Sequence, residues 1–135
     1  MRLLAIDPGK DKCGIAILDD SRVLEKKVIP PGDFFSIINS ILEQYQIEKI
    51  ILGDRTFSSQ TKKEIEARTK GKWSGEIVLV DEHLSTQEAR SRYWQGNPPK
   101  GLKKLIPLSM QTPPEPYDHY VALILAERYL SRLED

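Results

Sequence analysis

The stretch RLLAIDPGKDKCGIAIL, residues 2–18, decides the fold of this chain. It contains two short apolar runs, 2–7 and 13–18, separated by a polar turn that begins with Pro8-Gly9. Apolar runs of this length with turn residues between them predict two β-strands. The first run ends in an acid, Asp7, and Gly14 near the start of the second run is expected to allow a close approach of the backbone.

The segments that follow extend this pair into a mixed sheet. Turn residues at 19–21 lead into a third apolar run at 22–29, so the first three strands predict an antiparallel meander. Apolar residues then recur at helical spacing from Phe34 to Tyr45, and Asp33 is expected to cap that helix.

The second half of the chain alternates strands with helices. Apolar runs at 47–52 and 77–80 predict two more strands, and the remaining predicted helices are listed here with their approximate ranges: 58–69, 85–94 and 117–133. Ser85 and Thr86 with Glu88 are expected to cap the second of these helices. The order β-β-β-α-β-α-β-α-α predicts an α/β fold with a mixed five-stranded sheet, a three-strand antiparallel meander plus parallel strands, flanked by helices.

Length and composition narrow the class of protein. The chain has 135 residues, which fits a single domain over 1–135, and a formal net charge of zero. One cysteine, Cys13, excludes an internal disulfide and suits a reducing compartment. No apolar stretch approaches the roughly 20 residues that span a bilayer, and the first residues do not resemble a signal peptide. We therefore expect a cytoplasmic protein with no membrane partner.

Acidic residues follow the three strands that are expected to run parallel. Asp7 ends the first strand, Asp54 follows the fourth, and Asp81-Glu82 follow the fifth. Parallel strands bring their carboxyl ends to one edge of a sheet, where such folds bind ligands. Asp also suits turns, so any one of these acids has a purely structural explanation. The set as a whole predicts a functional edge.

Asp118 adds a fourth position to this set. It lies on the same helical face as the predicted inward stripe of the last helix, which is Ala122, Leu125, Ala126, Tyr129 and Leu133. It also occupies the first turn of that helix, where the helix dipole favours an acid. Clustered carboxylates repel one another unless a cation offsets them, and their hard oxygen atoms suit Mg²⁺ or Mn²⁺. The pattern predicts metal-assisted hydrolysis.

Basic residues gather in two places that suit contacts with phosphate. Lys10 and Lys12 lie in the turn after Asp7. The segment between Glu88 and Glu115 contains no acid and includes Arg90, Arg92, Lys100, Lys103 and Lys104. Local basic segments can bind a nucleic-acid backbone even in a neutral protein. An ordinary solvated surface is the alternative interpretation.

At this point three motifs resemble one known group. DPGKDKCGIAIL, residues 7–18, looks like the first two strands of RuvC-type Holliday junction resolvases and their YqgF relatives. VDEHLSTQEA, residues 80–89, resembles the YqgF signature, with His83 at a position that is usually Arg. PYDHYVALILAERYL, residues 116–130, resembles the closing helix of both groups.

The resemblance implies an RNase H-like fold and a metal-dependent nuclease. Asp7 would bridge the metal ions, Glu82 and Asp118 would complete the catalytic carboxylates, and Asp54 and Asp81 are further candidate metal ligands. The substrate would be structured nucleic acid, either branched DNA, as in a Holliday junction, or structured RNA, as in ribosomal RNA processing. The sequence leaves a monomer and a homodimer equally open.

Two alternatives stay open at this stage. One is a nucleic-acid-binding module that keeps the fold but does not cut, which the altered signature residues favour. The other is a phosphoryl-transfer domain of the actin-like type, although the chain contains no glycine-rich phosphate loop. The nuclease interpretation depends on the acids at 7, 82 and 118 converging in space.

Overall fold

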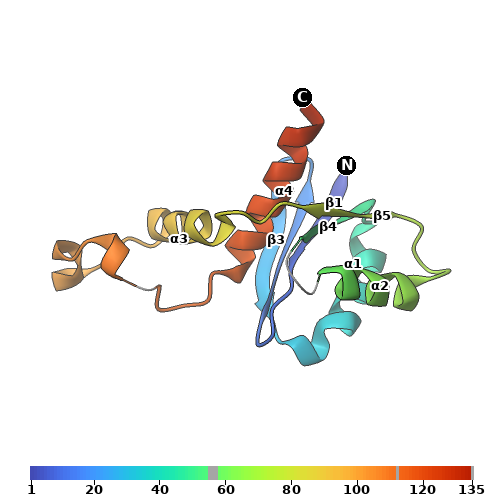
Figure 1. The fold of residues 1–135 in the computed structure, drawn as a ribbon, viewed down its shortest axis with the longest axis horizontal. Helices are drawn as coiled ribbons and strands as arrows, with labels where there is room; N and C mark the ends of the chain where they lie inside the picture. Colours follow the sequence, from blue (N-terminus) through green and yellow to red (C-terminus); the bar gives the residue numbers. More distant parts are fainter. Residues whose placement is uncertain (55–57, 112, 135) are drawn as a thin grey trace.

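The computed structural model describes residues 1–54, 58–111 and 113–134 (Figure 1). The strands are β1 (Arg2–Asp7), β2 (Cys13–Asp19), β3 (Arg22–Ile29), β4 (Lys49–Gly53) and β5 (Glu76–Val80). The α-helices are α1 (Phe34–Tyr45), α2 (Ser58–Thr69), α3 (Ser85–Gly96) and α4 (Asp118–Glu134). Three short 3-10 segments are η1 (Pro31–Asp33), η2 (Gly101–Leu105) and η3 (Leu108–Met110).

The five strands form one mixed sheet in the order β3-β2-β1-β4-β5. β2 pairs antiparallel with both β1 and β3, whereas β4 runs parallel to β1 and β5 runs parallel to β4. The predicted meander and the predicted parallel strands are therefore both confirmed. β1 and β4 end at the same edge of the sheet, which is where the parallel arrangement predicts a site.

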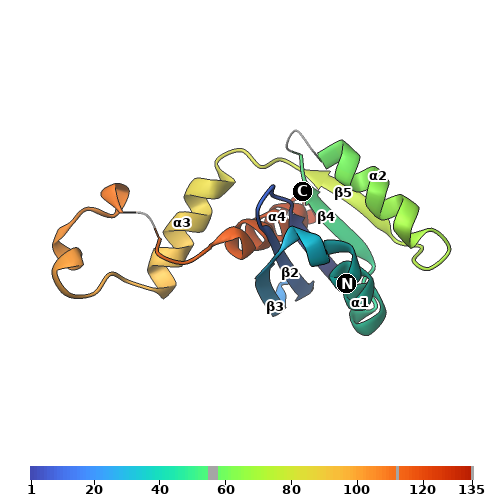
Figure 2. The same ribbon diagram turned by 90° about the horizontal axis from the view of Figure 1, so that it is seen from below.

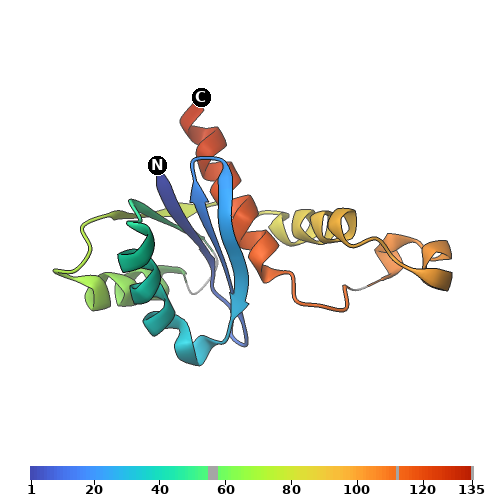
Figure 3. The same ribbon diagram turned by 180° about the vertical axis from the view of Figure 1, so that it is seen from behind.

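Alternating residues of β1 serve two separate hydrophobic cores. Leu4 and Ile6 pack on one face, in a cluster that contains Ile38 of α1 and Ile65 of α2. Leu3 and Ala5 pack on the other face, in a cluster built with α4. Figure 3 shows the same arrangement, with α1 and α2 on one side of the sheet and α4 on the other. The successive apolar residues of β1 thus reflect a central strand covered on both faces.

α3 and the segment after it do not cover the sheet. Ala89 of α3 packs with Val121 and Ile124 of α4 in a small third cluster. Beyond α3 the chain continues as an extension, here called the arm, which comprises residues 97–111 and 113–117 and includes η2 and η3. Figures 1 and 2 show α3 and the arm projecting away from the sheet before the chain returns to α4.

The local caps differ from the sequence prediction. Asp33 precedes α1, but its side chain makes no capping bond within the described residues. α3 starts after Leu84, whose φ of 59° is left-handed, so Ser85 is the first helical residue and the predicted Ser-Thr-Glu cap is wrong. The turn leaving Glu82 fixes where this helix begins, and local propensity does not.

The inward stripe predicted for α4 is correct except at its end. Ala122, Leu125, Ala126 and Tyr129 are buried in the core between α4 and the sheet, but Leu133 is 54% exposed. Figure 1 shows α4 continuing past the ends of the strands, so its last turn has no sheet to cover. None of the described helices is long and apolar enough to cross a membrane.

Candidate active site

Two glycines, Gly14 and Gly53, flank Asp7 and leave a surface without bulky side chains at the edge of the sheet, here called the floor. Asp7 pairs with Gly14 of β2, and Gly53 of β4 follows the pairing of Ile6 with Leu52, so it lies on the other side of Asp7. Residues side by side in neighbouring strands point to the same face. Because Ala5 faces α4, Asp7 and both glycine positions also face α4. Acidic groups from other elements can therefore approach Asp7 closely.

The carboxyl group of Glu82 occupies one half of this floor. A Cβ atom on Gly53 would lie 2.2 Å from both Cδ and Oε1 of Glu82. Asp7 and Glu82 are both buried, with 5% and 6% of their surface exposed. β5 ends at Val80, directly beside Gly53, and the following turn carries Glu82 back over the α4 face. The carboxyl groups of Asp7 and Glu82 are thus neighbours, although 75 positions separate them in the chain.

The start of α4 occupies the other half of the floor. A Cβ atom on Gly14 would lie 2.0 Å from the carbonyl oxygen of Asp118. Gly14 is the register partner of Asp7, so the first turn of α4 lies beside Asp7. The close approach expected at Gly14 is confirmed. Burial raises the pKa of the Cys13 thiol, which precedes Gly14, and the negative charges of Asp7 and Asp118 raise it further.

The donor atoms of this floor suit a hard divalent cation. Asp7 and Glu82 contribute buried carboxylates, and Asp118 is half-buried at the same edge. Oxygen ligands of this kind are those that Mg²⁺ and Mn²⁺ prefer. Within residues 1–54, 58–111 and 113–134, no three His, Cys, Asp or Glu side chains are grouped closely enough to hold a metal ion as they lie. The backbone brings the three positions to one edge of the sheet, but their side chains as they lie do not form a ligand set.

Asp54 and Asp81 lie beside the floor and organise the turn that carries Glu82. Both side chains are exposed. Oδ1 of Asp54 accepts a hydrogen bond from the backbone N–H of Glu82 at 3.2 Å, and Oδ1 of Asp81 accepts one from His83 at 2.9 Å. These bonds fix the backbone on each side of Glu82. The structure therefore gives both acids a turn-forming role that the sequence analysis did not separate from metal binding.

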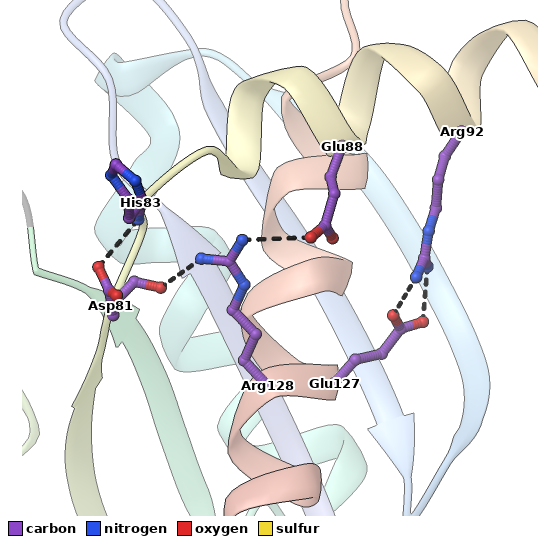
Figure 4. A network of polar contacts seen from close by, with 6 residues as sticks. All are labelled: Asp81, His83, Glu88, Arg92, Glu127 and Arg128. Atoms are coloured by element: carbon purple, nitrogen blue, oxygen red, sulfur yellow. Dashed lines mark hydrogen bonds and ion pairs between the residues drawn. The ribbon is translucent and has the colours of Figure 1, made fainter.

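A network of charged side chains joins α3, α4 and the end of β5 (Figure 4). The guanidinium of Arg128 donates to the carbonyl oxygen of Asp81 at 2.7 Å and contacts Glu88 at 3.4 Å. One turn along α3, Arg92 donates two hydrogen bonds to the carboxylate of Glu127. Sequence analysis missed this network. The available signal was the spacing of Glu88 and Arg92, four residues apart on one face of α3. The adjacent Glu127 and Arg128 on α4 are their partners.

The predicted phosphate-binding residues fall into four groups. Lys10 and Lys12 are exposed in the turn that follows Asp7. The arm carries three exposed lysines, Lys100, Lys103 and Lys104. Arg90 is exposed and donates to the hydroxyl of Tyr117 at 3.1 Å. Arg92 differs from all of these, because its guanidinium is bound to Glu127 and joins two helices.

His119 follows Asp118 in the first turn of α4, where its backbone nitrogen would lie 2.7 Å from a Cβ atom on Gly14. It is half-buried, and within the described chain its buried Nδ1 atom has no hydrogen-bond partner. Burial lowers the pKa of His119, and the positive charge of Lys26 lowers it further, while Asp118 opposes both effects. Burial and Lys26 therefore both favour the neutral form of the imidazole.

Comparison of the sequence with known proteins gives a consistent result over nearly the whole chain. Residues 1–132 match the family described as RuvX: Holliday junction resolvase. A relative from Mycoplasmopsis pulmonis is 30% identical over 97% of this chain and 93% of its own length. A relative from Dictyoglomus thermophilum is 28% identical over 96% of this chain and 95% of its own length. Both carry the name "Putative pre-16S rRNA nuclease".

Solved structures support the same fold. Thermus thermophilus RuvC in complex with a Holliday junction substrate matches with a TM-score of 0.63 at 14% identity, over 98% of this chain and 96% of that chain. The fowlpox virus Holliday junction resolvase matches with a TM-score of 0.65 at 13% identity, over 98% of this chain and 99% of that chain. The RNase H-like fold implied by the sequence is thereby confirmed, and the chain belongs to the RuvX Holliday junction resolvase family.

Proposed function

We propose that this protein is a divalent-metal-dependent nuclease that hydrolyses phosphodiester bonds in structured nucleic acid. Membership of the resolvase family and the names of the relatives support the reaction class. The observation that carries the proposal is the glycine floor around Asp7, over which the carboxyl of Glu82 and the start of α4 converge. Carboxylate oxygen atoms gathered at one place are the ligands that Mg²⁺ and Mn²⁺ prefer.

The roles of the three acids follow from their positions. Asp7 lies at the centre and would contact a metal ion shared with either neighbour. Glu82 would supply the ligand from the β4 side, and Asp118 would supply the ligand from the β2 side. When bound, Mg²⁺ or Mn²⁺ activates water and stabilises the leaving oxygen in phosphodiester cleavage. Asp54 and Asp81 would act mainly through the backbone on each side of Glu82.

The cationic residues would hold the substrate. Lys10 and Lys12 lie in the turn next to Asp7, where they would contact the phosphates closest to the scissile bond. Lys100, Lys103 and Lys104 would contact phosphates farther along the same strand. The substrate would be branched DNA or a precursor of 16S ribosomal RNA, encountered in the cytoplasm, where a single unpaired cysteine is stable. A homodimer would suit a two-fold symmetric junction, and a monomer would suit RNA.

A cleavage assay on two substrates tests the proposal. The purified protein is incubated with a four-way DNA junction and with a 16S ribosomal RNA precursor, with Mg²⁺ or with EDTA. Wild type should cut at least one of them in a metal-dependent way. Asp7→Asn should cut each substrate at least about 10²-fold more slowly, whereas the control Asp33→Asn, which removes an exposed acid next to α1, should cut at the wild-type rate. Equal cleavage by Asp7→Asn and wild type would overturn the assignment, and tight binding without cleavage by wild type would favour the non-catalytic module.

A further inference from the structure

α3 and the arm together form an excursion of the chain between two acids of the candidate site, Glu82 and Asp118. The chain leaves the sheet edge after Glu82, runs out along α3, passes through η2 and η3, and returns at Asp118. The 12 residues of α3 correspond to about 18 Å of helix. Arg92 and Glu127, together with Arg128 and Glu88, fix α3 to α4 along this length. Whatever binds the arm is therefore held in a defined relation to the floor.

The far part of the arm exposes large apolar side chains. Leu102 is 84% exposed, Leu105 is 83% exposed and Met110 is 76% exposed. The two 3-10 turns that carry them are joined by Gln111, whose side-chain amide donates to the carbonyl oxygens of Lys103 and Ile106, both at 2.9 Å. Leu102 and Leu105 lie three positions apart in η2, and side chains at this spacing in a 3-10 helix are on the same side, so the two leucines form one exposed apolar surface. Because hydrogen bonds hold the turns, the surface is formed before a partner arrives.

The charge around these side chains identifies the kind of partner. Lys100, Lys103 and Lys104 lie between and beside the exposed leucines, and the sequence contains no acid between Glu88 and Glu115. A second copy docking arm to arm would bring lysines against lysines, which is costly. A polyanion would neutralise the charges of the lysines, and the bases of a nucleic acid would make apolar contacts with the leucines.

We propose that the arm is a wedge for base-paired nucleic acid. Leu102 and Leu105 would insert into the nucleic-acid duplex at a branch or a bulge, where the stacking of the bases is already interrupted. The lysines would bind the adjoining phosphates. Apolar side chains inserted between base steps are a known way for proteins to bind distorted duplexes. The inference rests on the proposed nuclease function and narrows its substrate to helices with a discontinuity.

A hollow at the root of the arm fits this assignment. It has a volume of about 510 Å³ and lies between the end of α3 and the arm, with Trp94, Lys100 and Lys103 among the residues that line it. Its volume is within the range of ordinary ligand sites in proteins. A base displaced by the wedge could enter this hollow and contact Trp94, with Lys100 and Lys103 near its phosphate.

Binding measurements in the Asp7→Asn background, without metal, test the wedge independently of cleavage. The probes are a four-way DNA junction, a bulged RNA hairpin and a continuous DNA duplex, with 2-aminopurine at the discontinuity and at the matching position of the duplex. Three further changes are compared in this background: Leu102→Ser with Leu105→Ser, Lys103→Gln with Lys104→Gln, and the control Leu133→Ser, which removes an exposed leucine from the far end of α4. Circular dichroism and sedimentation velocity establish folding and oligomeric state.

The leucine variant should lose the rise in 2-aminopurine fluorescence and bind the interrupted probes about tenfold more weakly, with duplex binding unchanged. The lysine variant should bind all three probes more weakly, with a salt slope reduced by about 1.8 on DNA. The control should behave like its parent. The wedge is overturned if the leucine variant keeps the fluorescence change and the preference for interrupted probes, or if it only converts a dimer to a monomer. A wedge signal in a protein that cuts nothing would instead remove the nuclease proposal alone.

Discussion

The floor around Asp7 and the arm beyond α3 are built in opposite ways. The floor is lined by buried acids, lies on the central strand of the sheet, and has a large hydrophobic core beneath it. The arm is basic, has exposed leucines, and has short turns held by a few hydrogen bonds. A site that positions charges is best built on a rigid element such as a central strand, whereas a surface that binds a long polymer is often carried by a loop that extends from the domain. Under the two proposals above, chemistry and substrate selection are separated in this molecule and joined through α3 and α4.

The largest expected effect separates chemistry from binding at the floor. Asp7→Asn keeps the size of the side chain but removes its charge, so cleavage should fall by about 10²–10³-fold or more, since a catalytic metal contributes several kcal/mol. Binding of a four-way junction, measured by fluorescence anisotropy in EDTA, should change by less than about twofold, because the arm is untouched. A comparable loss of binding would show that the two regions do not act separately.

A second change moves the carboxyl of Glu82 without removing it. In Gly53→Ala the new methyl group would meet the end of the Glu82 side chain, which is flexible and can swing away, so the fold should persist while cleavage falls by about tenfold or more. The control is Gly32→Ala, where a Cβ atom meets nothing within 4 Å. Cleavage rates and thermal unfolding of both variants are the measurements. Wild-type cleavage by Gly53→Ala would mean that the position of Glu82 is not critical.

A third change tests the connection between the two regions. Arg128→Ala removes the bond to the carbonyl of Asp81, next to Glu82, and the contact with Glu88 on α3. We expect stability to fall by about 1 kcal/mol and kcat to fall several-fold while KM stays the same, because the turn carrying Glu82 loosens. Arg132→Ala, one turn farther along α4 over the ring of Tyr129, serves as the control. It should alter stability slightly and leave kcat unchanged.

The smallest effect concerns pH at the start of α4. The pKa of His119 is lowered in the folded protein, chiefly by burial and by Lys26. As pH falls below the unfolded value of about 6.5, the unfolded chain takes up a proton before the folded one, so His119 reduces stability there. Urea unfolding of metal-free protein between pH 7.5 and 5 should show a smaller loss for His119→Gln than for wild type. Equal losses would mean that burial does not disfavour the charged imidazole.

The sequence analysis predicted the sheet and the acidic positions because both depend on local patterns. Apolar runs followed by acids predicted strands β1, β4 and β5. The helical spacing of apolar residues predicted which face of α4 is buried. Whether Asp54 or Glu82 reaches the floor could not be predicted, because the answer depends on how the chain turns after β5. The structure shows the carboxyl of Glu82 over Gly53, with Asp54 exposed and bound to the backbone of Glu82.

The features that sequence analysis missed all depend on how distant segments of the chain lie relative to one another. The Arg92–Glu127 pair requires two helices to lie side by side, so the sequence could not show that Arg92, a predicted phosphate contact, joins α3 to α4. The exposure of Leu102 and Leu105 could not be predicted either, because the sequence does not show that the arm leaves the sheet. An aperiodic group of leucines in a segment rich in proline and lysine was the available signal.

The central claim is that Asp7, Glu82 and Asp118 share bound cations on the α4 face of the sheet. Anomalous diffraction from a crystal soaked in Mn²⁺ tests it most directly. We expect a peak at the glycine floor, about 2.0–2.2 Å from oxygen atoms of Asp7 and of at least one of the other two acids. A crystal of active protein whose Mn²⁺ lies elsewhere, with the three carboxyl groups turned away from one another, would contradict it.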